Sequence, residues 1–258
     1  MSLKILTYNV NGIRSALTKN LLGFLERENP DIVCMQEIKA QPNQIDNSLF
    51  EHLGYCCYWF SAEKKGYSGV GILSKQKPKH VEYGIGHELF DYEGRIIRAD
   101  FDSFSVISAY FPSGTTGPVR QDVKYVFLDT IYNHIEKLKE KIPNLIICGD
   151  YNICHEAIDI HDPKGNKDSS GFLPEERAWM SAFFKSGFVD TFRFLNPGVP
   201  HKYTWWSFRA NARNNNKGWR IDYISVNEEL SDKIKEANIL PFDLQSDHCA
   251  SYTVMDIG

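Results

Sequence analysis

Polar side chains capable of acid–base or metal chemistry recur in this sequence where short apolar runs begin or end. The residues are Asn9, Asn11, Glu37, Tyr110, Asp150, Asn152, Asp222, Asp247 and His248. The carboxylates could hold a divalent cation and activate a water molecule. The amides, the phenol and the imidazole could donate hydrogen bonds to a developing negative charge. Together these groups suit phosphodiester hydrolysis, which needs a cation, a base for water and donors to the phosphate.

Taken alone, these residues also have structural interpretations. Asn9 could bond a turn, Glu37 could cap a following helix, and His248 beside Asp247 could form a surface pair. Only Asp150 favours catalysis by itself. The chemistry therefore requires several strand ends to meet at one rim and surround a single polar pocket. The sequence contains no GxSxG, HExxH, GxGxxG or GxxxxGK[ST] motif, so it does not indicate those nucleophile, zinc or nucleotide sites.

The apolar runs predict the elements that must position these side chains. Strands are predicted at residues 3–10, 31–36, 70–73, 104–111, 145–148, 221–226 and 250–254. Helices are predicted from Thr18, as the N-cap, to before Pro30, and at residues 119–141 and 174–185. Many strands, few long helices and hairpin-like spacings predict an α+β fold with two packed, mostly antiparallel sheets flanked by helices. No linker divides the chain, so residues 1–258 are predicted to form a single catalytic domain.

The composition is that of a globular protein, with 42% hydrophobic and 24% charged residues and a net charge of −4. The six cysteines show no zinc-type spacing, and several lie in apolar runs, which favours a reducing compartment. The sequence shows no signal peptide and no apolar run of transmembrane length. We therefore expect a cytoplasmic protein without a membrane partner.

A basic and aromatic stretch covers residues 203–221. It contains no Asp or Glu, and its prominent residues are Trp205, Trp206, Arg209, Arg213, Lys217, Trp219 and Arg220. Such a stretch could be a solvated loop. It could equally be a surface that follows a nucleic-acid backbone and stacks on bases, and composition alone does not separate the two.

Several short motifs, in order along nearly the whole chain, carry a family resemblance. They are Tyr8-Asn9-Val10-Asn11-Gly12-Ile13-Arg14, Gln36-Glu37-Ile38-Lys39, Gly66-Tyr67-Ser68-Gly69, Gly149-Asp150-Tyr151-Asn152, Gly218-Trp219-Arg220-Ile221-Asp222 and Ser246-Asp247-His248. The chain resembles the endonuclease/exonuclease/phosphatase superfamily, and within it the exonuclease III and apurinic/apyrimidinic endonuclease branch.

The resemblance implies a four-layered α/β sandwich with its site at the strand ends. It implies an Mg²⁺-dependent DNA-repair phosphodiesterase, with Mn²⁺ as a possible substitute. The enzyme would cut the backbone 5′ to abasic sites in base excision repair, with 3′–5′ exonuclease and 3′-end-cleaning activity. Its partner would be double-stranded DNA with abasic sites or blocked 3′ ends. We expect a monomer that is nucleoid-associated and bacterial.

The resemblance also implies a role for each site residue. Glu37 would bind the metal, with Asp247 and Asn11 close by. Asp150 would activate or orient water, held by Asn9 and Asn152. His248, paired with Asp222, would contact the scissile phosphate, and Tyr110 would stabilise the phosphate or the leaving group with a pKa lowered by nearby cationic charge. The remaining implied roles are an abasic-sugar pocket of Trp205, Trp219 and Ile221, and phosphate contacts from Arg14, Lys39, Tyr67, Asn166, Lys167, Arg213 and Lys217.

The sequence departs at four positions from one abasic endonuclease of this branch that it resembles. Asn11 stands where that enzyme has an acid, Ser113 replaces an Asn, Trp205 replaces a Phe, and Asp168 adds an acid to a loop that is basic there. Three alternatives remain: a predominantly 3′–5′ exodeoxyribonuclease, a superfamily phosphatase or phosphodiesterase acting on inositol phosphates, sphingomyelin or RNA tails, and a non-catalytic DNA-binding module.

Overall fold

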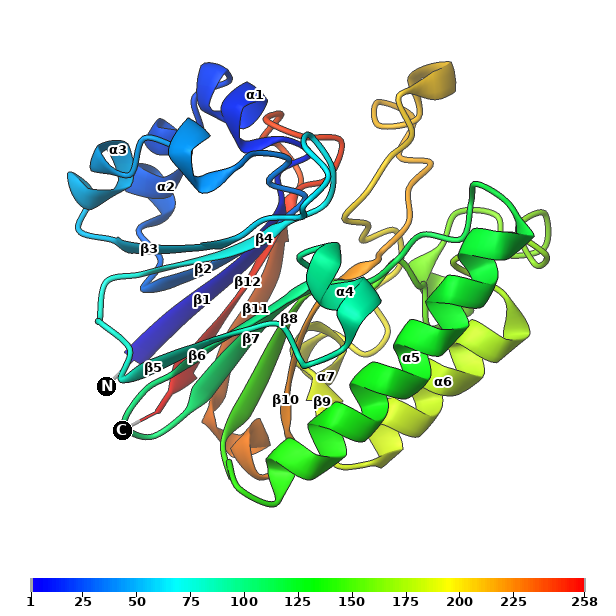
Figure 1. Cartoon of the computed structure of the whole chain (residues 1–258). Coiled ribbons are helices and arrows are strands. Elements are labelled where there is room, and N and C mark those ends of the chain that lie inside the picture. Colours follow the sequence, from blue (N-terminus) through cyan, green and yellow to red (C-terminus); the bar gives the residue numbers. More distant parts are fainter. Residues whose placement is uncertain (1, 258) are drawn as a thin grey trace.

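Two six-stranded β-sheets pack face to face in the computed structural model, which describes residues 2–257 (Figure 1). The strand order in the first sheet is β11 (Ile234–Leu240), β12 (Ala250–Asp256), β1 (Ser2–Asn9), β2 (Ile32–Gln36), β4 (Val70–Ser74) and β3 (Cys56–Phe60). The order in the second is β5 (His80–Tyr83), β6 (Ile96–Asp100), β7 (Ser105–Tyr110), β8 (Leu145–Asp150), β10 (Asp222–Asn227) and β9 (Phe188–Asp190).

The two sheets share one pattern of strand directions, although no sequence repeat is visible. Each has a central parallel pair, β1 with β2 and β7 with β8, and antiparallel pairs on both sides. The prediction of an α+β fold with mostly antiparallel sheets is therefore confirmed. Parallel neighbours end at the same edge, so Asn9 pairs with Gln36 in the first sheet and Tyr110 with Asp150 in the second.

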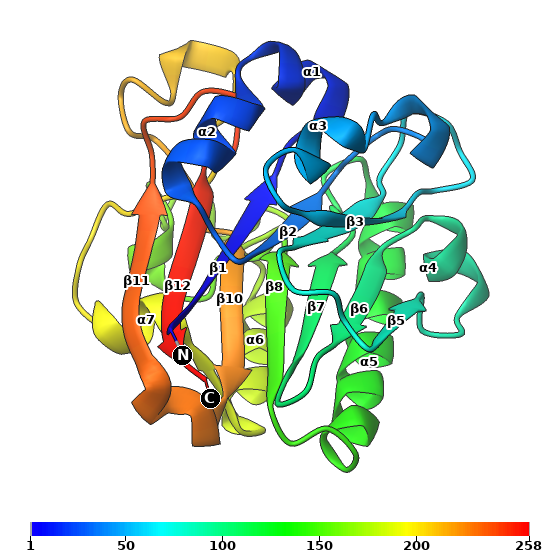
Figure 2. The same cartoon turned by 90° about the vertical axis from the view of Figure 1, so that its left-hand side faces the viewer.

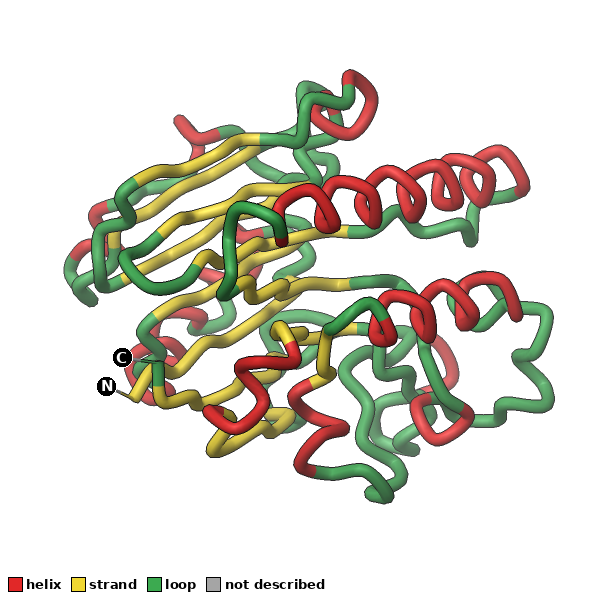
Figure 3. The backbone as a smooth tube through the Cα atoms, turned by 90° about the horizontal axis from the view of Figure 1, so that it is seen from below, coloured by secondary structure: helices red, strands yellow, loops and turns green. Residues whose placement is uncertain are grey.

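Helices cover the outer face of each sheet and complete four layers (Figures 1 and 2). The first sheet carries α1 (Ile13–Thr18), α2 (Leu21–Glu28) and α3 (Ser48–Glu51). The second carries α4 (Glu88–Tyr92), α5 (Pro118–Lys139) and α6 (Pro174–Lys185), of which α5 and α6 run side by side (Figures 1 and 3). The remaining elements are α7 (Thr191–Leu195) and the 3₁₀ turns η1 (Pro42–Gln44), η2 (Ala157–Asp159), η3 (Arg209–Asn211) and η4 (Glu228–Lys233). Among the described residues, no helix is long and apolar enough to cross a membrane.

A polar link joins the two sheets inside their otherwise apolar interface. Gln36 lies at the end of β2 with no exposed surface, and its Nε2 donates to Ser108 Oγ on β7 at 3.1 Å. Ser108 Oγ donates in turn to the Met35 carbonyl at 3.1 Å, and Thr7 Oγ1 donates to Gln36 Oε1 at 3.3 Å. Because a buried polar group without partners is costly, this chain of bonds fixes how β2 and β7 lie against each other.

The structure corrects one predicted helix and adds five strands. Thr18 is not an N-cap but the last residue of α1, where its Oγ1 donates back to the Ser15 carbonyl at 2.8 Å. The chain then turns through Asn20 in a left-handed conformation (φ 65°), so α2 is a separate helix. Strands β3, β5, β6, β9 and β11 were not predicted. The edge strands among them are partly exposed, so their apolar patterns are weak.

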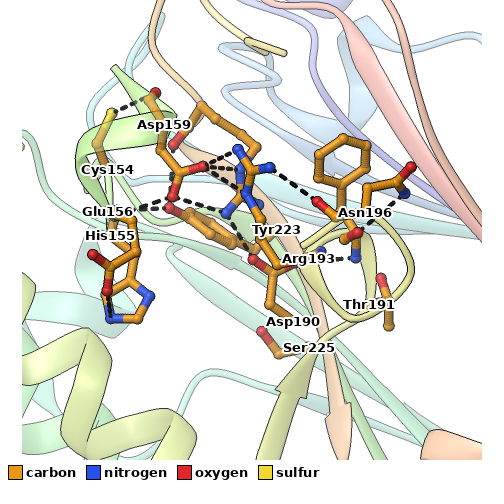
Figure 4. Close-up of polar contacts among 12 residues, drawn as sticks. Cys154, His155, Glu156, Asp159, Asp190, Thr191, Arg193, Asn196, Tyr223 and Ser225 are labelled. Carbon is orange, nitrogen blue, oxygen red and sulfur yellow. Dashed lines mark hydrogen bonds and ion pairs between the residues drawn. The ribbon is translucent and has the colours of Figure 1, made fainter. Parts of the chain in front are cut away.

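Arg220, one of the cations in the basic stretch of residues 203–221, belongs to a buried network of ion pairs. Arg220, expected near a surface, is only 1% exposed. Its Nε lies 2.8 Å from Asp159 Oδ1 and its Nη2 lies 2.7 Å from Asp190 Oδ2. Arg193 binds the same Asp159 oxygen at 2.6 Å, and Figure 4 shows Asp159, Asp190 and Arg193 in one network of polar contacts. Arg220 therefore joins η2, β9 and β10, and contributes nothing to a DNA surface.

We predict that Arg220→Met lowers the free energy of unfolding by about 3–5 kcal/mol, because it leaves buried carboxylates without their cation. Urea denaturation followed by tryptophan fluorescence measures this change. Arg209→Met, which removes an exposed charge from the same stretch, should leave the midpoint nearly unchanged. Equal midpoints for the two variants would contradict the structural role of Arg220.

Candidate active site

Three loops at the rim of the first sheet are tied together through their backbones. The Gly12 N–H donates to the Glu37 carbonyl at 2.7 Å, so the loop after β1 binds the loop after β2. The Ile38 N–H donates to the Gly69 carbonyl at 3.1 Å, and the Lys39 N–H donates to the Ser68 carbonyl at 2.9 Å. These backbone hydrogen bonds fix the positions of the three loops and of the side chains that they carry.

Several rim residues adopt the left-handed backbone conformation. The φ angles are 44° at Asn11, 52° at Glu37, 49° at Lys39 and 52° at Asn152. Asn tolerates this region, but Glu and Lys do so at a cost of about 1–3 kcal/mol each. Such strain is typical of functional sites, where the surrounding structure holds a side chain in an otherwise unfavourable orientation.

Asp150 lies at the centre of the site, at the end of β8, and is 1% exposed. Its Oδ2 accepts a hydrogen bond from Asn9 Nδ2 at 2.8 Å, and its Oδ1 accepts one from the Asn152 N–H at 2.8 Å. The Asn152 side chain turns away and donates to the Phe111 carbonyl at 2.9 Å. Asn9 and Asn152 therefore both hold Asp150, as expected, but Asn152 does so through its backbone.

Gly149, directly before Asp150, is required by close packing of the strands. A Cβ at this position would lie 1.9 Å from the Ala109 carbonyl oxygen of β7. Any larger residue would push β8 away from β7 and move Asp150 relative to Tyr110, its partner in the register. The site therefore requires glycine at position 149, because a larger residue would displace Asp150.

His248 and Asp222 form a buried pair beside Asp150. His248 Nδ1 lies 2.9 Å from Asp222 Oδ2, and its Nε2 lies 3.8 Å from Asp150 Oδ2. The Asp222 carboxylate fixes the Nδ1–H, so Nε2 faces the centre of the site. This is the predicted pairing, and the structure brings both residues to the same rim as Asp150 and Glu37.

The charges of these groups shift one another's pKa values. Burial acts to lower the pKa of His248, but the carboxylates of Asp222 and Asp150 outweigh it and raise the pKa to about 10. Burial, followed by the charge of Asp222, raises the pKa of Asp150 to about 8. Burial acts to raise the pKa of Glu37, but Lys39, the hydrogen bond from Asn9 and the charge of His248 together outweigh it, and the net shift is downward. At neutral pH the metal-free site therefore holds a cationic His248 and an anionic Glu37.

One cluster could hold a metal ion. Ligand atoms of Glu37, Asp150 and His248 all lie within 4.8 Å of one another. Of the three predicted ligands, only Glu37 belongs to this cluster. Asp247 and Asn11 lie to one side and bind each other, with Asn11 Nδ2 at 2.8 Å from Asp247 Oδ1.

Tyr110 has the opposite pKa shift to the one expected. Burial and then the carboxylates of Glu37 and Asp150 raise the pKa of Tyr110 well above its usual value, and the nearby Arg95 only partly offsets them. The expectation of a lowered pKa was wrong for the metal-free site, because the phenol is buried and because Glu37 and Asp150 outweigh the nearby Arg95. Tyr110 is therefore a neutral hydroxyl that can donate a hydrogen bond.

Sequence reasoning missed Arg95, which supports this part of the rim. The residue is 1% exposed, and its guanidinium carbon lies 4.9 Å from the centroid of the Tyr110 ring. Its Nη1 donates to the Tyr110 carbonyl at 2.9 Å, and its Nη2 donates to the Tyr67 hydroxyl at 3.0 Å. Tyr67, expected to contact a phosphate, is thus anchored here and only half-buried. The sequence does offer one signal for Arg95, because a charged residue stands there directly before the apolar start of β6.

An apolar wall stands beside His248. Trp205 and Trp219 meet edge to face, with ring centroids 6.0 Å apart and planes at 88°. They pack on Ile221, which is 5% exposed, and on the cluster of Cys154, Ile160, Ile221 and Phe172. Gly171 lets its own loop lie close against the Trp219 ring, since a Cβ there would lie 2.8 Å from Trp219. The three residues predicted to line a pocket therefore do come together.

The predicted phosphate-contact residues differ in their availability. Arg14, Lys167 and Lys217 are exposed, whereas the Asn166 side chain donates to the His161 and Asp162 carbonyls, each at 3.0 Å. Lys39 Nζ lies 2.6 Å from Glu37 Oε2, inside the site.

Arg213 donates to the backbone carbonyls of Ser246 at 2.8 Å, Pro241 at 3.0 Å and Asp243 at 2.6 Å. Its guanidinium is thus occupied in holding the loop before His248, which makes it a positioning residue and not a phosphate contact.

Comparisons with known proteins agree on one family. The profile described as the endonuclease/exonuclease/phosphatase family matches residues 6–248. The chain is 41% identical to an exodeoxyribonuclease of Bacillus subtilis over 99% of this chain and 100% of that protein. It is 40% identical to a DNA-(apurinic or apyrimidinic site) endonuclease of Dictyostelium discoideum, over 99% and 71%. Its fold matches a 3′ phosphatase from Neisseria bound to a product DNA hairpin, with a TM-score of 0.91, 25% identity and coverage of 99% and 100%.

We predict that Asp150→Asn stabilises the metal-free protein increasingly as the pH rises from about 4 to 8. The pKa of Asp150 is raised from 3.8 to about 8, so in this window the folded state binds more protons than the unfolded state. The contribution of Asp150 to the free energy of unfolding of the wild type therefore falls as the pH rises, and the variant loses this contribution. Thermal denaturation in chelator at several pH values tests it. Asp168→Asn, at an 85% exposed side chain, should behave as wild type; a pH-independent difference for Asp150→Asn would contradict the shift.

Proposed function

The chain belongs to the endonuclease/exonuclease/phosphatase family of hydrolases, and on that basis we propose that it is a DNA-repair phosphodiesterase that incises the backbone 5′ to abasic sites. The observation that carries this proposal is the position of the Trp205–Trp219 wall directly beside His248, whose ring centroid lies 6.4 Å from that of Trp205. An apolar wall against which a sugar could pack thus adjoins the groups suited to phosphate chemistry.

Mg²⁺ is the proposed cofactor, with Mn²⁺ as a substitute. The carboxylates of Glu37 and Asp150 offer oxygen atoms close enough to share one ion, whereas His248, which is cationic, stays a hydrogen-bond donor. Oxygen donors suit a hard divalent cation, and Glu37, the predominantly ionised member, is the main proposed ligand. When bound, the cation would neutralise charge on the phosphate and stabilise the leaving oxygen.

Asp150 is proposed to receive the proton of the attacking water. Its Oδ2 faces Asn9 Nδ2 and His248 Nε2, which fix its orientation. A cation beside Asp150 would lower its pKa from the raised metal-free value and make the carboxylate available as a base. His248 would then donate from Nε2 to a phosphate oxygen, with Asp222 retaining the positive charge on the ring. Tyr110 would donate its hydroxyl proton to the phosphate or the leaving oxygen.

Selection of abasic sites would follow from the size of the pocket and the cost of extrusion. A nucleotide without a base loses little stacking when it leaves the duplex, whereas a normal base must be unstacked and would meet the Trp205 and Trp219 rings. Exposed cations around the rim would position the duplex through its phosphates without reading sequence. The exposed cations are Arg14, Lys167 and Lys217, and the partly buried Lys39, Tyr67 and Asn166 are the other proposed phosphate contacts.

The proposal extends to the state and location of the protein. We propose a monomeric, single catalytic domain over residues 1–258 that acts on double-stranded DNA in the bacterial cytoplasm, at the nucleoid. The six free cysteines, none of them in a disulfide, support a reducing compartment. Residues 1 and 258 lie outside the described structure.

A second candidate is predominant 3′-end processing. The Bacillus subtilis relative is named an exodeoxyribonuclease, and the Neisseria protein is a 3′ phosphatase. Both reactions use water to break a phosphate ester at a 3′ end, which the same acid, base and cation could catalyse. The choice between the two candidates depends on how readily the pocket accepts an internal abasic sugar.

We predict Mg²⁺-dependent incision immediately 5′ to an abasic analogue in an end-labelled duplex, with no cut in a matched undamaged duplex and no activity in chelator. Asp150→Asn should nearly abolish turnover while DNA binding by anisotropy stays close to wild type, because Asp150 acts on water and contacts no DNA in this proposal. Shortening of both duplexes from their 3′ ends would move the assignment to the exonuclease. Comparable cleavage by the variant would contradict the role of Asp150.

We further predict that affinity for duplex DNA falls steeply with salt. In a plot of the logarithm of the binding constant against the logarithm of the salt concentration, each phosphate contact should add about −0.9 to the slope. Lys217→Met should make the slope less steep by about one such contact, because the exposed ammonium would no longer displace a counterion. Lys233→Met is the matched control, since Lys233 lies in η4 at the end of β10 opposite Asp222. A flat salt response, or equal slopes for the two variants, would count against the proposed basic rim.

A further inference from the structure

The buried pair of Lys124 on α5 and Glu176 on α6 takes no part in the proposed mechanism. Neither side chain has any exposed surface, and Lys124 Nζ lies 2.5 Å from Glu176 Oε1. Burying two charges costs free energy that their attraction does not always recover, and apolar residues of similar volume often fill such a space equally well. The contacts that each partner makes beyond the pair are therefore the informative ones.

Lys124 holds the backbone of the residue that fixes Asp150. Its Nζ donates to the Asn152 carbonyl at 2.8 Å. Asn152 has the left-handed backbone conformation, with φ 52°, and its own N–H donates to Asp150 Oδ1 at 2.8 Å. Because the two bonds hold the groups on either side of one Cα atom, Lys124 limits the rotation of Asn152. It thereby fixes the direction from which Asp150 is held.

Glu176 holds the loop that packs on the apolar wall. Its Oε2 accepts hydrogen bonds from the Gly171 N–H at 2.6 Å and from the Leu173 N–H at 3.0 Å. Gly171 lies against the Trp219 ring, where a Cβ would be only 2.8 Å away. The Gly171 carbonyl in turn accepts from the Cys154 N–H at 2.7 Å, so this loop is also bound to the segment that follows β8.

We propose that Lys124 and Glu176 are positioning residues for cleavage, and that together they place the carboxylate of Asp150 relative to the apolar wall. An apolar pair could fill the same space between α5 and α6, but it could neither donate to the loop after β8 nor accept from the loop around Gly171. A single buried ion pair thus links the group that acts on water to the surface that receives the sugar. The inference rests on the proposed function, because only cleavage makes the position of Asp150 matter.

The test compares kcat and KM for incision of an abasic duplex in Mg²⁺ with stability from thermal denaturation. Lys124→Met leaves the Glu176 carboxylate buried without its cation, so it should lose stability as well as activity. The double variant Lys124→Met with Glu176→Gln is neutral and keeps an oxygen for the Gly171 N–H. It should recover most of the stability and keep KM within about twofold, but its kcat should stay about 10- to 100-fold below wild type, the scale of a misplacement of about 1 Å.

A second double variant separates the two contacts of the pair. Lys124→Met with Glu176→Leu is equally uncharged but has no acceptor for the Gly171 N–H. It should show the same loss of kcat and, in addition, a higher KM for the abasic duplex, because the loop against Trp219 is released. The matched control is Ile135→Ala, which empties part of the buried core further along α5 and should lower stability without changing kcat or KM.

Recovery of kcat together with stability in the Glu176→Gln double variant would overturn the inference, because the pair would then serve the fold alone. An unchanged KM in a folded Glu176→Leu double variant would also overturn it, since the pair would then have no hold on the wall. Failure of both double variants to fold would do the same, because the pair would then be a requirement of the fold. No cleavage by the wild type would overturn the proposed function itself, and the inference with it.

Discussion

Two carboxylates that repel each other, Glu37 from the first sheet and Asp150 from the second, share the side-chain amide of Asn9. The amide nitrogen lies 2.9 Å from Glu37 and 2.8 Å from Asp150. Like charges within 4.8 Å repel by roughly 3 kcal/mol at the effective dielectric of a protein rim. Asn9, which is fully buried, donates to both acids and so helps the site to keep them close together. Burial and the charge of Asp222 raise the pKa of Asp150, Glu37 adds to this shift, and a bound cation would oppose it.

The rest of the sandwich keeps this arrangement in register. Asn9 pairs with Gln36 at the end of the parallel pair of the first sheet, and Tyr110 pairs with Asp150 at the end of the parallel pair of the second. The hydrogen bond from Gln36 to Ser108 then sets one sheet against the other. A shift of one residue in either sheet would turn the corresponding side chains to the opposite face, so the chemistry depends on the strand register as much as on the residues.

The sequence predicted the site better than it predicted the surroundings of the site. Asp150 was recognisable because it is a polar residue at the end of an apolar run, whereas the role of His248 followed only from the family resemblance. The partners of Arg220 and Arg213 were not recognisable, since Asp159 is 61 residues from Arg220 and the Ser246 carbonyl is 33 residues from Arg213. Whether a cation is buried in a network or free at the surface depends on tertiary contacts that composition does not encode. The same holds for Tyr110, whose pKa is set by acids brought in by other strands.

The two ends of the described chain lie side by side, far from this chemistry. Ser2 at the start of β1 pairs with Asp256 at the end of β12, while β1 runs from there to Asn9 at the rim (Figure 2). The whole length of the first sheet therefore separates both ends from the face that would receive DNA. A tag, an anchor or an additional folded unit joined at either end would leave that face open, and a short bridge between the ends would allow the chain to be reopened elsewhere as a circular permutant.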